Sequence, residues 1–102
     1  MNGRITAAAD APAEGERVVR LAVGHGFSVE QILSGALSAP QDYEQDHDEW
    51  VVVLQGEADL EVEGRVLTLV AGDWLLIPGS TPHRLLRTEP ATRWLAVHVQ
   101  PG

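Results

Sequence analysis

Residues 50–78 read WVVVLQGEADLEVEGRVLTLVAGDWLLIP, and this stretch decides the fold class. Its first run, 50–54, is apolar and rich in β-branched valine, which is typical of a strand with both faces covered. The segment 58–63 then alternates, because Leu60 and Val62 share one face while acidic residues occupy the other. Short apolar runs separated by Gly, Pro and Asp predict an all-β protein.

Turn signals divide the rest of the chain into further strands. Glu63-Gly64 predicts a hairpin turn, and WLLIP (74–78) predicts another buried strand. Residues 29–37 also fit helical spacing, but an internal glycine and β-branched residues favour a strand. Additional candidate strands occupy residues 17–23, 27–33, 36–40, 65–70, 83–88 and 93–99. Roughly eight strands at a spacing of roughly ten residues are typical of a sandwich or barrel.

Composition limits the classes of partner and chemistry. The 102 residues include 7 basic residues, all arginine, and 15 acidic ones, for a net charge of −8. This charge argues against a nucleic-acid partner and against an anionic membrane. The absence of cysteine excludes disulfides, thiolate catalysis and cysteine-ligated metals.

The length suits one domain, which we place at residues 17–102, after a flexible N-terminal arm at residues 1–16. No apolar run approaches the roughly 18 residues of a membrane span. The N-terminus also lacks the features of a secretory signal. We therefore expect a cytoplasmic protein.

The densest polar segment is DYEQDHDEW, residues 42–50, directly before the buried run. In an extended strand, Tyr43, Gln45, His47 and Glu49 share one face, because side chains alternate. One face of this strand therefore carries four groups able to bind a ligand or transfer a proton.

Two more histidines complete a possible metal site. His83 follows a proline-bounded loop, and His98 interrupts the last apolar strand. A divalent Zn, Fe, Mn or Ni ion favours imidazole and carboxylate ligands. His83, Glu49 and either His47 or His98 would supply them, with Gln45 as a weaker oxygen ligand. A carboxylate buried in a barrel needs a partner, which here would be a metal, an arginine or a protonated histidine.

A family resemblance appears at the same residues. The chain resembles the cupin superfamily, specifically its small single-domain type, over residues 28–99. Two half-motifs carry the resemblance: Glu49-x6-Gly56, and Gly72-x5-Pro78 followed by His83. In the second motif, Ser80 and Arg87 occupy positions where the family has glycine and asparagine.

The resemblance implies a double-stranded β-helix, a jelly-roll-like barrel of two antiparallel sheets with an inner pocket. In metal-binding cupins, two histidines, a glutamate and a later histidine hold one divalent metal. Those positions fall on Tyr43, Gln45, Glu49 and His83, so the histidine pair is missing here. His47, two residues before Glu49, would restore a ligand after a small local shift.

Two classes of function remain open. The first is a metal-dependent isomerase, cyclase, decarboxylase or oxygenase, in which Glu49 is a ligand or a base. The second is a non-catalytic binding or sensor module for a small polar molecule, with a structural metal or none. Tyr43 and His98 are expected in the pocket, although His98 also suits a hydrogen-bonded core position, and Glu49 could instead pair with Arg84 or Arg93. Edge strands suggest a homodimer.

Overall fold

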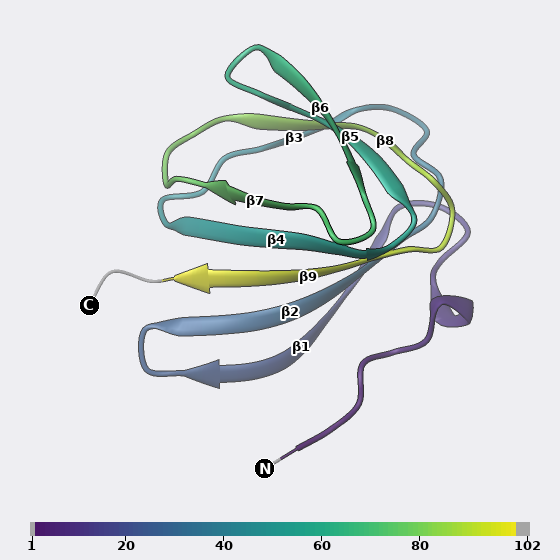
Figure 1. Ribbon diagram of the computed structural model, residues 1–102, viewed down its shortest axis with the longest axis vertical. Helices are drawn as coiled ribbons and strands as arrows, with labels where there is room; N and C mark the ends of the chain where they lie inside the picture. The colour runs from purple at the N-terminus through teal and green to yellow at the C-terminus, as the bar shows by residue number, and fades with distance from the viewer. Residues whose placement is uncertain (1, 100–102) are drawn as a thin grey trace.

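The computed structural model describes residues 2–99. Within them the chain forms nine strands and one short 3-10 helix (Figure 1). The elements are η1 (Ala8–Asp10), β1 (Glu16–Gly24), β2 (Phe27–Ser34), β3 (Gln41–Tyr43), β4 (Asp48–Gln55), β5 (Glu57–Val62), β6 (Arg65–Val70), β7 (Trp74–Ile77), β8 (His83–Thr88) and β9 (Thr92–Val99). No helix among these residues is long and apolar enough to cross a membrane.

The strands form two antiparallel sheets that pack face to face. One sheet has the order β1-β2-β9-β4-β7 and the other β3-β8-β5-β6 (Figure 1). Every strand pairing is antiparallel. Apolar side chains from both sheets meet between them, among them Val53, Leu60, Leu85 and Trp94. The prediction of an all-β fold with two antiparallel sheets is confirmed.

The hairpin between β5 and β6 turns where the sequence predicts. Glu63 and Gly64 both have positive φ, 52° and 78°, as a two-residue turn of matching twist requires. Residues 27–34 form strand β2, so the strand interpretation of this region is also correct.

Two sequence-based boundaries are wrong. Residues 36–40 do not form a strand; the short strand β3 follows instead, at residues 41–43. Residues 42–50 are not one strand either, because residues 44–47 are irregular and β4 starts at Asp48. A contact from the loop before β8 stabilises the break: the backbone N–H of Ser80 donates to the carbonyl of Gln45 across 2.5 Å.

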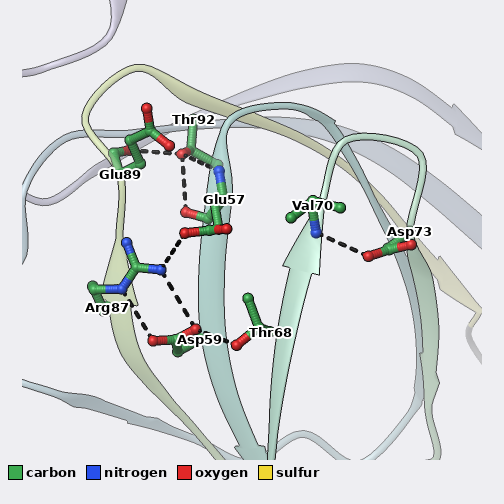
Figure 2. Close-up of polar contacts among 8 residues, drawn as sticks. All are labelled: Glu57, Asp59, Thr68, Val70, Asp73, Arg87, Glu89 and Thr92. Carbon is green, nitrogen blue, oxygen red and sulfur yellow. Dashed lines mark hydrogen bonds and ion pairs between the residues drawn. The ribbon is translucent and has the colours of Figure 1, made fainter.

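The outer faces of the two sheets carry different clusters of side chains. On the four-stranded sheet, Arg87 bonds to Asp59 at 3.0 Å and to Glu57 at 2.6 Å (Figure 2). The hydrogen bond from Arg87 holds the pKa of the Asp59 carboxyl below its usual value. On the five-stranded sheet the outward residues of β7 are apolar: Trp74 is 62% exposed and Leu76 52%. The prediction that WLLIP is a buried run is therefore wrong for these two residues, because β7 buries alternate side chains, and also for Pro78, which is exposed just after the strand.

The N-terminal segment lies against the five-stranded sheet. The side chain of Gln31 on β2 accepts from the Thr6 N–H at 2.6 Å and donates to the Thr6 carbonyl at 2.8 Å. Gln31 and Leu33 point away from the core between the sheets, yet both are fully buried. The arm thus covers this part of the outer face; its flexibility stays a prediction.

Candidate functional site

A cavity of about 190 Å³ lies between the two sheets. Its polar lining consists of Glu16, Glu30, Tyr43, Gln45, Glu49, His83 and His98, and its apolar lining of Val51, Leu60, Ile77, Leu85 and Trp94. Except for Gln45, which lies in the irregular segment 44–47, these residues come from the inward positions of both sheets, where side chains alternate between core and surface. We call this space the inter-sheet cavity.

Glu49 is the buried carboxylate of this cavity. It lies on β4 opposite Ile77 and His98 in the neighbouring strands, and is 7% exposed. The Gln45 amide donates to Oε1 of Glu49 across 2.7 Å. His83 Nε2 lies 3.8 Å from Oε1, and His98 Nε2 lies 3.8 Å from Oε2. One carboxylate therefore stands between two imidazoles, beyond direct hydrogen-bond distance of both.

His83 is held in one orientation at the start of β8. Its Nδ1 lies 3.0 Å from the carbonyl oxygen of Thr81, which can only accept, so Nδ1 carries the proton. The ring stacks on Tyr43 with centroids 5.7 Å apart. These contacts direct Nε2 toward Glu49 and the cavity.

His98 joins the cavity to a second imidazole. Its Nε2 lies 3.0 Å from Glu30 Oε2, and its Nδ1 lies 2.9 Å from His47 Nε2. His47 Nδ1 in turn lies 3.1 Å from Asp46 Oδ1. The four side chains form one hydrogen-bonded chain, and His47 reaches the cavity lining only through His98.

Glu16 forms the opposite wall of the cavity. Its carboxylate accepts from the Tyr43 hydroxyl at 2.7 Å and from the Ser34 hydroxyl at 2.9 Å, and Trp94 Nε1 donates to Ser34 Oγ at 3.1 Å. Burial, followed by the hydrogen bond and the charge of Glu16, raises the pKa of the Tyr43 phenol far above its usual value. Tyr43 is therefore a neutral hydrogen-bond donor in this wall.

The structure brings most of the predicted site residues together. Tyr43, Gln45, Glu49, His83 and His98 all line the inter-sheet cavity. Side chains at 43–49 alternate in burial as predicted, even though the strand is broken.

The pairings suggested for a solvent-facing Glu49 do not form. Arg84 pairs with Asp42 instead, and Arg93 contacts Gln55 and the Thr6 carbonyl.

Sequence reasoning missed two carboxylates. Glu30 shares the inward face of β2 with Ile32, and its neighbour across the ladder is Ala96 on the strand that carries His98. The alternation of residues 27–34 together with His98 is a signal that could have found it. Glu16 was assigned to the end of the arm, and no sequence pattern separates it from the other acidic residues there.

The donors do not form a divalent metal centre in this arrangement. Among residues 2–99, no group of three or more His, Asp or Glu side chains is placed to hold a metal ion. The Gln45 amide is committed to Glu49, and both ring nitrogens of His98 face other side chains. Of the four ligands proposed from sequence, Gln45, Glu49 and His83 line the same cavity, whereas His47 is not part of its lining.

Comparison with known proteins agrees with this architecture. A family model described as Cupin domain matches residues 28–98. The chain is a member of the cupin family. No curated protein sequence matches it significantly.

Solved structures of other cupins resemble this one over most of its length. A candidate mannose-6-phosphate isomerase from Ralstonia eutropha JMP134 is 33% identical, with a TM-score of 0.82, over 97% of this chain and 100% of that chain. KdgF from a Halomonas species is 20% identical, with a TM-score of 0.77, over 86% and 82% of the two chains. The Cupin_2 domain of an XRE family transcriptional regulator from Enterobacter cloacae is 21% identical, with a TM-score of 0.70, over 85% and 98%. The last two show the fold alone.

Proposed function

We propose that this cupin binds a small polar organic molecule in the inter-sheet cavity, with Glu49 and His83 as its principal contacts. One observation carries the proposal: the Glu49 carboxylate and His83 Nε2 face each other across 3.8 Å inside the cavity, without a hydrogen bond between them. Polar groups buried at this depth are costly unless they are partnered. A molecule that contacts both supplies the missing partner.

The apolar half of the lining supports an organic ligand. Leu60, Leu85 and Trp94 bring hydrocarbon surface to the same cavity that holds the carboxylates. Binding sites for small molecules commonly combine such a surface with a few placed polar groups.

Binding can be tested by NMR with a mixed set of small polar compounds. The indole resonance of Trp94 reports on the cavity wall, because its N–H bonds to Ser34 beside Glu16. We expect at least one compound to shift this resonance in the parent chain and not in a Glu49→Ala/His83→Ala double variant that remains folded. If no compound shifts it in the parent, the proposal fails.

A divalent metal, the occupant that the family suggests, is the competing possibility. The donor types are suitable, but their arrangement does not bring three of them to one point. Elemental analysis of untagged protein separates the two cases. We expect the same substoichiometric metal content in the parent and in the double variant; stoichiometric metal in the parent alone would establish a metal centre.

Acid–base catalysis on the bound molecule is the second candidate function. It is favoured by a carboxylate and an imidazole that address the same space, since the carboxylate can accept a proton and the imidazole can donate one once Nε2 is protonated. Glu49 would be the base. Exchange of a carbon-bound proton of the ligand for solvent deuterium, lost in Glu49→Gln with binding retained, would demonstrate it.

We further propose that a second copy of this chain covers the outer face of the five-stranded sheet. Strands β4, β7 and β9 present an apolar patch on this outer face. It consists of Trp50, Val52, Leu54, Trp74, Leu76, Leu95, Val97 and Val99, and it ends at the polar residues Gln55 and Arg93. Two chains of charge −8 repel each other, so an uncharged face is where they can meet. A two-fold pair places this patch against itself.

A further inference from the structure

The inter-sheet cavity is acidic. Three of its lining residues carry carboxylates, namely Glu16, Glu30 and Glu49. The lining contains no lysine or arginine. A phosphate or carboxylate ligand would meet only negative charge here, apart from the two histidines. The lining therefore disfavours anionic ligands and favours cationic ones.

His83 supplies the independent observation. Its side chain is 6% exposed, and its Nδ1 proton is committed to the Thr81 carbonyl. Nε2 is therefore a bare acceptor in the neutral ring, and it has no hydrogen-bond partner among residues 2–99. Its nearest charged neighbour is Glu49 Oε1, another acceptor, at 3.8 Å. Oε1 already accepts from Gln45, so the acceptor without a donor here is His83 Nε2, which needs one from water or from a ligand.

The second oxygen of Glu49 has the same need. It lies 3.8 Å from His98 Nε2, but that nitrogen is closer to Glu30, at 3.0 Å. The only hydrogen bond to the Glu49 carboxylate from residues 2–99 comes from Gln45. A single ligand group that serves both His83 Nε2 and the Glu49 carboxylate must offer more than one donor, and positive charge on it is favoured beside the carboxylate, as in an ammonium group.

The cavity is larger than an ion requires and is partly apolar. About 190 Å³ of space with Leu60, Leu85 and Trp94 in its lining suits a short hydrocarbon skeleton. This size and lining favour an organic cation over a bare metal ion, in agreement with the lack of converging metal ligands among the described residues.

A neighbouring hollow has the same sign of charge. Tyr43 and His83 also line a wider hollow of about 620 Å³ next to the cavity. The charged residues of this hollow are Asp42, Glu44, Glu61, Glu63 and Arg84. Four carboxylates against one guanidinium, which is itself paired with Asp42, attract cations toward the two aromatic rings.

We propose that the ligand of this cupin is a compact organic amine, whose ammonium group lies between Glu49 and His83 and whose carbon chain lies against the apolar wall. This inference rests on the proposed binding function and specifies its ligand class.

The test compares ligands that are matched in shape and differ in charge. Serinol, glycerol and glycerate form one set; putrescine, 1,4-butanediol and succinate form another. Binding is measured by calorimetry and by the Trp94 indole resonance. We expect each amine to bind at least about tenfold more tightly than its neutral counterpart, and the anions not to bind, because only the amines offer charged donors.

Three variants locate the binding. Glu49→Gln removes the central charge and should weaken amine binding at least about tenfold. Glu30→Gln leaves Glu49 in place and should weaken it by a smaller factor, which keeps the test valid if Glu49→Gln does not fold. Glu89→Gln, at an exposed turn, is the matched control and should change nothing.

Other outcomes overturn the inference in distinguishable ways. If glycerol, butanediol or the anions bind as tightly as the amines and the cavity variants abolish that binding, the ligand class is wrong and the cavity function stands. If amines bind equally well to the parent and both cavity variants, they bind elsewhere and the inference fails. If Zn²⁺ displaces the amines stoichiometrically, the site is a metal site. If no probe shifts the Trp94 resonance, the proposed function fails as well.

Discussion

The hydroxyl of Tyr43 donates a hydrogen bond to the carboxylate of Glu16 across 2.7 Å and thereby joins the two sheets. Tyr43 ends β3 in the four-stranded sheet, and Glu16 begins β1 at the edge of the five-stranded sheet. The residues are 27 positions apart in sequence, so this contact in the lining of the inter-sheet cavity forms only in the folded state.

We expect Tyr43 to titrate well above the ordinary value of a phenol, about 10. Burial is the larger cause and Glu16 the next, so Glu16→Gln should lower the pKa of Tyr43 without returning it fully to that value. Tyr43 is the only tyrosine in the chain, and the ultraviolet absorbance of tyrosinate therefore reports on one site. A parent protein that titrates near 10 while still folded would contradict this.

The same shift affects stability at high pH. The native phenol keeps its proton to a higher pH than the unfolded one, so the native state binds more protons above about pH 10. The free energy of unfolding should fall as pH rises from there. Tyr43→Phe should remove that part of the slope in urea titrations at several pH values.

Gly56 should be intolerant of any side chain. Its φ is +95°, and a Cβ there would lie 2.2 Å from Thr92 Oγ1, which donates to the Glu89 carbonyl at 2.6 Å (Figure 2). Gly64 is the matched control, because its φ is +78° but a Cβ meets nothing within 4 Å. We expect roughly 1–2 kcal/mol of destabilisation for Gly64→Ala from backbone strain, and roughly 2–5 for Gly56→Ala from strain and overpacking. If both variants lose the same free energy of unfolding in urea, the Thr92 side chain moves aside without cost.

Gln31→Ala should destabilise the protein by about 1–3 kcal/mol. Gln31 is fully buried and makes two hydrogen bonds to the Thr6 backbone, so its loss frees the arm and opens the outer face above Leu33. Ser38→Ala, at an exposed position between strands, is the control in denaturant unfolding. If the two variants have the same free energy of unfolding, the arm is detached in solution, which is what the sequence-based prediction of a flexible arm states.

Trp74→Glu should convert the proposed homodimer to a monomer. The substitution places a negative charge in the apolar patch of β4, β7 and β9, where Trp74 lies 6.2 Å from Trp50 between ring centroids. Val66→Glu, 59% exposed on β6 of the other sheet, should leave the dimer intact. Light scattering after size-exclusion chromatography measures both masses. A parent chain that is monomeric at every concentration would refute the proposal.

Residue alternation explains what the sequence could predict. Glu49 and His83 were found because each interrupts or begins an apolar strand at a motif position, and both line the cavity. The burial alternation at 43–49 also holds, since it depends only on the direction of neighbouring side chains.

Contacts between distant segments account for the errors. The break at 44–47 depends on the Ser80 loop, which no local pattern encodes. WLLIP reads as continuously apolar, and only the sheet order shows that β7 is an edge strand with one outward face. Glu16 joins the cavity through Tyr43, a contact between residues that are 27 positions apart.

The chain of side chains that runs from Asp46 to Glu30 gives the cavity a second connection to its surroundings. Asp46 is 96% exposed, whereas His47 and His98 are 15% and 12% exposed. An imidazole can take up a proton at one ring nitrogen and release it from the other. This hydrogen-bonded chain therefore offers protons a route, through side chains alone, between bulk water at Asp46 and the carboxylate of Glu30.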